Sequence, residues 1–97
     1  MVYTGATPVA VTGTAVQFST TSQECTLIKI KAIKASGAAN GAIVYIGGPT
    51  VTAATGYPLA VGAEATFDTN PTNAYNLMDF WVNGTTTDGV VWLYVRR

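Results

Sequence analysis

Apolar and polar residues alternate along much of this chain with the period of two that a half-buried β-strand requires. The clearest case is the segment 25–34, in which Ile28 and Ile30 are interleaved with Lys29 and Lys31. The isoleucines are therefore expected on one face of a strand and the lysines on the other. No stretch shows the 3.6-residue period of a helix longer than a turn or two.

Glycine and proline interrupt this pattern about every ten residues, a spacing typical of sandwiches and barrels. The sequence therefore predicts an all-β fold, an antiparallel β-sandwich that is jelly-roll-like and has about eight strands. We expect a single domain over residues 1–97, with a short N-terminal arm over about residues 1–7, which lack a strand pattern. Strands are expected within 8–12, 14–18, 25–34, 42–46, 63–68, 76–83 and 89–96.

The last two apolar runs, 76–83 and 89–96, are expected to form a hairpin around the turn-like segment 84–88. Both faces of this hairpin are apolar. Alternation places Met78, Phe80, Val82, Val91, Leu93 and Val95 on one face, and Leu77, Trp81, Val90, Trp92 and Tyr94 on the other. A sheet of this type usually has one polar face, so a loop, the N-terminal arm, a second copy or a partner must cover the second one.

Alternation within each strand also predicts the core. Its expected members are Ile28, Ile30, Val44, Ile46, Phe67, Phe80, Val82, Leu93 and Val95.

Composition favours a component of an assembly. Charged residues make up 10% of the chain, against about 25% in an ordinary domain, and the formal net charge is zero. No overall field attracts nucleic acid or an anionic membrane, and weakly charged proteins tend to associate. We therefore expect a homo-oligomer, with a trimer favoured, in contact through Trp92 and Tyr94 or through the opposite face at Leu93. No apolar run is long enough to span a bilayer, and no secretion signal follows Met1, so synthesis in a cytoplasm is expected.

The residue inventory disfavours catalysis. Histidine is absent, which removes Ser-His-Asp and Cys-His chemistry, and the single cysteine, Cys25, is expected to be a small buried residue. One cysteine without histidine does not make a zinc site. Asp88 beside Thr85–Thr87 fits either a weak calcium site or, more simply, an Asp-Gly turn. We therefore expect no enzyme activity, no cofactor and no metal.

Six residues are candidates for an interface. The aromatic residues Trp81, Trp92, Tyr94 and Tyr45 fit a core, a platform for sugar stacking or a protein contact. Lys29 and Lys31 fit a solvated strand face or a contact with an acidic protein surface.

A succession of turn and core motifs covers about three quarters of the chain. From about Thr26 onward it runs through Gly41-Ala-Ile-Val-Tyr-Ile-Gly47, Val51-Thr52, Gly56-Tyr-Pro-Leu59, Gly62-Ala-Glu64 with Phe67, Asn76-Leu77, Trp81-Val-Asn-Gly84 and the final run from Val90 to Val95. This succession resembles small β-sandwich proteins of tailed-phage virions, of the capsid decoration (cement) or head-fibre type.

The resemblance implies a non-enzymatic structural virion protein. In this interpretation the chain is a capsid decoration subunit, made in the host cytoplasm and located in the virion, that binds and stabilises the phage head. Its partner would be the major capsid protein or another virion protein. The alternative is a tail or head-fibre module that binds host glycan or another virion protein.

Overall fold

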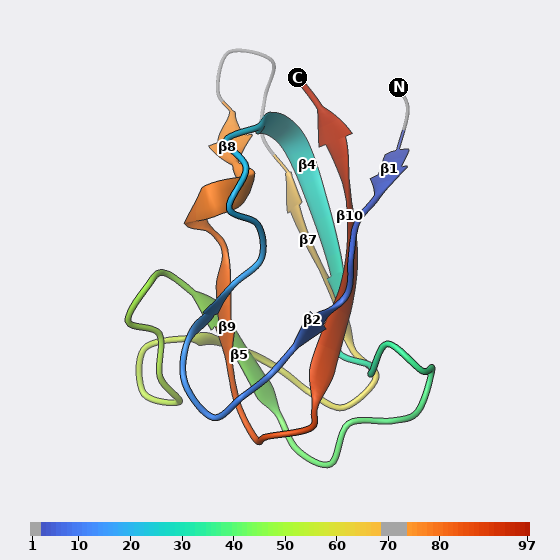
Figure 1. The fold of residues 1–97 in the computed structure, drawn as a ribbon, viewed down its shortest axis with the longest axis vertical. Helices are drawn as coiled ribbons and strands as arrows, with labels where there is room; N and C mark the ends of the chain where they lie inside the picture. The colour runs from blue at the N-terminus through green and yellow to red at the C-terminus, as the bar shows by residue number, and fades with distance from the viewer. Residues whose placement is uncertain (1–2, 69–73) are drawn as a thin grey trace.

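The computed structural model describes residues 3–68 and 74–97, and it shows two antiparallel sheets packed as a β-sandwich (Figure 1). The predicted fold class is therefore confirmed. The large sheet contains β1 (Tyr3–Gly5), β2 (Val9–Ala10), β4 (Glu24–Lys31), β7 (Glu64–Asp68), β8 (Tyr75–Asn76) and β10 (Gly89–Arg96). The small sheet contains β3 (Val16–Gln17), β5 (Val44–Gly47), β6 (Tyr57–Leu59) and β9 (Trp81–Asn83). A 3₁₀ helix, η1 (Leu77–Asp79), lies between β8 and β9.

Strand β10, the last in the chain, is central to the large sheet. Its neighbours are β4 on one side and both β1 and β2 on the other, while β4 in turn pairs with β7 and β8. The order in the small sheet is β3-β9-β5-β6. Figure 1 shows the long β10 beside β4, with β9 and β5 in the other layer.

The expected hairpin over 76–83 and 89–96 is wrong. β9 pairs with β3 and β5, whereas β10 pairs in the other sheet, so the segment between them carries the chain across the sandwich. Two apolar strands joined by a short polar segment look alike in sequence whether they pair or cross. Each of the two strands has one face toward the shared core, which accounts for one apolar face in each strand.

The core lies between the sheets, and most of its predicted members are there. Ile28, Ile30, Val44, Ile46, Phe80 and Val82 are buried, and Phe67 is half-buried and packs against them. The lysines interleaved with the two isoleucines of β4 lie on the opposite face, as alternation predicts. Cys25 is also buried, as expected.

The predicted face of β10 is wrong. Val90 and Trp92 belong to the core and Tyr94 packs against it, whereas Leu93 is half-buried on the outer face. Val95 is buried but lies outside the main core cluster, in register with Leu27 of β4. Since residues 90–95 of β10 are all apolar, the pattern of this strand does not distinguish one face from the other.

The N-terminal segment differs from the expected arm, because it is part of the sheet. Tyr3–Gly5 form β1, in register with Val95, Tyr94 and Leu93 of β10. The indole Nε1 of Trp92 also donates a hydrogen bond to the carbonyl oxygen of Thr7, at 2.9 Å. Met1 and Val2, the rest of the expected arm, lie outside the described residues.

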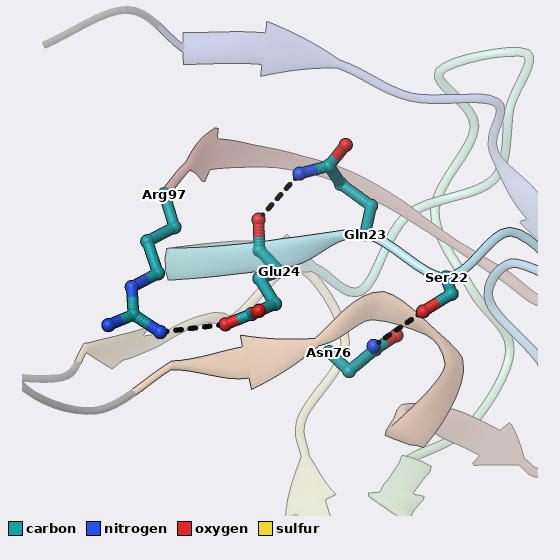
Figure 2. A network of polar contacts seen from close by, with 5 residues as sticks. All are labelled: Ser22, Gln23, Glu24, Asn76 and Arg97. Carbon is teal, nitrogen blue, oxygen red and sulfur yellow. Dashed lines mark hydrogen bonds and ion pairs between the residues drawn. The ribbon is translucent and has the colours of Figure 1, made fainter.

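A group of polar contacts closes the end of the large sheet where β4 begins (Figure 2). Arg97 forms an ion pair with Glu24 at 2.8 Å, and the Asn76 amide donates to the Ser22 hydroxyl at 2.9 Å. The Asn76 Oδ1 accepts from the backbone N–H of Met78 and so caps η1. Because the ion pair is exposed, it contributes little to stability.

Candidate functional site

The sandwich separates the six candidate interface residues into three places. Trp92 and Tyr94 face inward from β10, with ring centroids 5.8 Å apart in a stacked arrangement. Trp92 also meets Phe18 edge-on at 5.2 Å and is only 7% exposed. Trp92 therefore offers little surface to a partner, and of the two contacts considered for β10, the face that contains Leu93 is the accessible one.

Lys29 and Lys31 lie on the outer face of the large sheet. The register places Leu93 beside Lys29 and Val91 beside Lys31, and the two lysines lie beside Thr66 and Glu64 of β7. We call the surface formed by Leu27, Lys29, Lys31, Val91, Leu93, Glu64 and Thr66 the outer large-sheet face. A shallow depression of about 170 Å³ lies between its lysines and Val91 and Leu93.

This face combines aliphatic and charged side chains. Leu27, Val91 and Leu93 are half-buried, so part of each remains in contact with solvent, and Lys29 is exposed. The aliphatic side chains form a strip with lysines beside it. Such a surface suits contact with another protein, because the hydrocarbon stems of the lysines can also pack against apolar surface.

Trp81 and Tyr45 lie on the other side of the molecule, on the outer face of the small sheet. The register puts Trp81 beside Gln17 and Gly47, and Tyr45 beside Asn83 and Pro58. Both rings are half-buried. The segment 48–56 covers part of this outer face. In the small sheet, a loop of the same chain therefore covers part of the apolar face that points away from the core.

Two glycines let this segment approach the sheet closely. A Cβ at Gly47 would lie 2.7 Å from Cγ2 of Val51, and one at Gly56 would lie 2.6 Å from Cβ of Tyr45. Both distances are too short for any other residue. Val51 is consequently only 4% exposed, although it belongs to a loop.

A groove of about 570 Å³ lies between this segment and the turn after β9. We call it the Tyr45 groove; its lining consists of Ala42, Ile43, Tyr45, Ala53, Asn83, Gly84 and Thr85. The lining contains one aromatic ring, one amide and one aliphatic hydroxyl, and no charged side chain. Of these residues the sequence singled out Tyr45 as a possible binding residue, whereas Asn83 was noted as the end of a strand and as part of a turn motif.

Side-chain hydrogen bonds fix the walls of the Tyr45 groove. The Asn83 amide donates to the carbonyl oxygen of Val51 at 2.9 Å, and its Oδ1 accepts from the N–H of Gly84 at 2.7 Å. Asp88 Oδ1 and Oδ2 accept from the backbone N–H groups of Gly41 and Ala42, at 2.8 and 3.1 Å. Loop 48–56, the start of β5 and the turn after β9 are thus held to one another.

Asn40 completes this polar anchor. Its amide donates to the carbonyl oxygen of Gly89 and accepts from the N–H of the same residue, both at 2.9 Å. Asn40 and Asp88 are buried, at 5% and 3% exposure. The interpretation of Asp88 as a turn residue agrees with the hydrogen bond from its N–H to Thr85 O, and both carboxylate oxygens are occupied by backbone donors.

The one thiol of the chain, Cys25, is buried. Burial raises the pKa of the Cys25 thiol to about 11, so the nucleophilic thiolate is disfavoured at neutral pH. Within residues 3–68 and 74–97, no three Cys, Asp or Glu side chains come together as a metal site. The same part of the chain has no helix of the length and apolar character needed to cross a membrane.

Comparison with known proteins gives no match: no family model fits the chain, and no curated protein or solved structure is significantly similar to it. The resemblance to phage virion proteins therefore rests on the turn and core motifs of the sequence alone.

Proposed function

We propose that this chain is a non-enzymatic structural subunit of a phage virion, a capsid decoration protein that binds the major capsid protein or another virion protein. The observation that carries the proposal is the outer large-sheet face, where Leu27, Val91 and Leu93 are half-buried beside Lys29. These aliphatic side chains gain free energy when a partner removes them from water. The class of partner, a virion protein, is inferred from the resemblance of the turn and core motifs to phage virion proteins.

The chemistry of the described residues favours binding over catalysis. The Asp88 carboxylate is occupied by two backbone donors, and the Cys25 thiol is buried with a raised pKa. A face of this limited size gives a modest affinity for one site. A capsid presents many identical sites, so an oligomeric subunit reaches tight attachment by avidity.

Binding to capsids tests the proposal. The purified protein, added to undecorated capsids of the phage, is expected to bind at saturable, symmetric sites and to raise the temperature at which the capsids rupture, since a ligand of the intact shell stabilises it. Electron microscopy of the decorated capsids gives the position and the copy number.

Two charge substitutions locate the contact. Leu93→Glu places a carboxylate on the outer large-sheet face and is expected to weaken capsid binding at least tenfold. Ile43→Glu makes the same change at a residue that is 42% exposed on the other side of the sandwich, and is expected to bind normally. Equal loss in both variants would contradict the assignment of the face. If the unmodified protein does not bind capsids, the decoration proposal is wrong and the tail or head-fibre alternative takes its place.

A further inference from the structure

The Tyr45 groove, of about 570 Å³, has walls that are fixed from several sides. Its three walls come from the start of β5, from loop 48–56 and from the turn after β9. The contacts of Asn83, Asp88 and Val51 join these walls without filling the space between them. A groove whose shape is set before a ligand arrives binds with little ordering cost.

The lining of the groove restricts the chemistry of a ligand. No lining residue is charged, so phosphates, carboxylates and polyamines would have no counter-charge there. The polar groups are the phenol of Tyr45 and the hydroxyl of Thr85, which both donate and accept hydrogen bonds, and the amide of Asn83, which keeps one N–H and one oxygen lone pair beyond its bonds to Val51 and Gly84. Beside them, Ala42, Ile43 and Ala53 provide apolar surface, and Ile43 is 42% exposed.

From this lining we infer that the Tyr45 groove binds a neutral saccharide. A sugar ring presents apolar C–H groups on its faces and hydroxyl groups around its rim, which matches an aromatic ring flanked by amide and hydroxyl groups. The volume of about 570 Å³ is in the range of small-molecule sites and is large enough for more than one sugar ring. This inference does not rest on capsid attachment, because the groove and the outer large-sheet face belong to opposite sheets.

A second depression, of about 290 Å³, serves as an internal comparison. It contains Phe18, Trp92 and Tyr94 among hydroxyl-bearing residues. Phe18 and Trp92 are only 7% exposed, so they offer little ring surface for stacking. Tyr94 is half-buried, as Tyr45 is, so it is the larger volume that favours the Tyr45 groove as the sugar site, and the two sites can be distinguished residue by residue.

Nuclear magnetic resonance titration of the full chain tests the inference. The probes are maltose, cellobiose, lactose and N,N′-diacetylchitobiose, each added up to tens of millimolar to ¹⁵N-labelled protein. At least one disaccharide is expected to give saturable shifts of the backbone amides of Tyr45, Ala53 and Gly84. Shifts confined to the depression around Tyr94, or no saturable shift with any of the four sugars, would overturn the inference.

A matched pair of variants shows whether the sugar occupies the groove. Ala53→Arg fills the groove from an exposed position, whereas Ala54→Arg makes the same change at the next exposed residue, which is not part of the lining. Ala53→Arg is expected to weaken sugar binding at least tenfold, and Ala54→Arg to leave it within twofold. Equal affinity in both variants would overturn the assignment.

A peptide ligand is the competing occupant, because aromatic and apolar grooves also bind extended proline-rich segments. A decaproline peptide added to the same labelled protein distinguishes the two. Saturable shifts of the groove amides with decaproline and none with the sugars would replace the saccharide assignment by a peptide site.

Discussion

Asp88 shows how one side chain can organise two loops that are distant in the sequence. Its carboxylate accepts backbone hydrogen bonds from Gly41 and Ala42, and its own N–H donates to Thr85 O. The sequence suggested a turn at Asp88 because an Asp-Gly pair is a local signal. The bonds to Gly41 and Ala42 could not be predicted, because those partners lie more than forty residues away in the chain.

Replacement of Asp88 is expected to cost much more than replacement of an exposed aspartate. Asp88→Ala leaves two backbone N–H groups without their acceptor in a partly buried place, and we expect a loss of about 2–4 kcal/mol in the free energy of unfolding. Asp79→Ala, at an exposed residue of η1, is the control and should change stability by less than about 0.5 kcal/mol. Urea denaturation measures both. Similar losses in the two variants would contradict the anchoring role.

Cys25 is expected to react slowly and to make stability depend on alkaline pH. The folded thiol has a pKa of about 11, against the ordinary value of 9.0, because burial disfavours the thiolate. Between these values the unfolded chain releases a proton that the folded chain keeps. The free energy of unfolding should therefore decrease as the pH rises from about 9 to about 11.

The Cys25→Ala variant separates this effect from other alkaline titrations, since its pH profile lacks the contribution of the thiol. A thiol reagent at pH 8 should modify the native protein far more slowly than the guanidinium-unfolded protein. Rapid modification of the native protein would show that Cys25 is accessible.

At the scale of the element, strands with polar residues on one face could be assigned from sequence and strands without them could not. Lys29 and Lys31 mark the outer face of β4, so its core residues were predicted correctly. In β10 the residues 90–95 are all apolar, and Leu93 was placed in the core instead of Trp92. The crossing between β9 and β10 was missed for the same reason. Without polar positions that mark the outer face of each strand, the sequence does not show that the two strands lie in different sheets with the core between them.

Truncation of a core side chain is expected to lower the free energy of unfolding more than truncation of a side chain on the outer large-sheet face. Phe80 contacts Phe67 and Tyr75 with ring centroids 5.5 Å away, and Phe80→Ala should lower the free energy of unfolding by about 3–5 kcal/mol. Leu93→Ala on the outer large-sheet face should cost less than about 1.5 kcal/mol, because the side chain is already partly in water. Chemical denaturation of both variants checks the order, and the reverse order would mean that the faces of β10 are assigned wrongly.

The N-terminal segment is expected to contribute to stability. As a free arm, residues 1–7 could be removed with almost no change in melting. Their deletion instead removes β1 and the acceptor of the Trp92 indole N–H, which lies in a part-buried place. We expect a loss of about 2 kcal/mol and a decrease of about 8–16 °C in melting temperature. Differential scanning calorimetry measures the shift; an unchanged melting temperature would favour the arm after all.

The whole molecule combines a neutral formal charge with an aliphatic outer face on its large sheet. Little electrostatic repulsion therefore opposes contact between copies. We expect reversible self-association through that face, with a trimer as the proposed state. Sedimentation equilibrium at micromolar to millimolar concentrations measures it. Leu93→Glu should shift the equilibrium toward monomer and Ile43→Glu should not, whereas a monomer at every concentration would contradict self-association.

The position of β10 has a consequence for the synthesis of the protein. β10 follows all of its partners in the sequence: β1, β2 and β4 pair with it, and residues 3–5 meet residues 93–95. While residues 89–96 are still inside the exit tunnel of the ribosome, the large sheet lacks its middle strand and the earlier strands have no partner to complete it. Pairing between segments that are distant in the sequence is slow because a long loop must close. The large sheet should therefore form only after β10 has left the tunnel, and until then the nascent strands depend on chaperones to avoid pairing with one another.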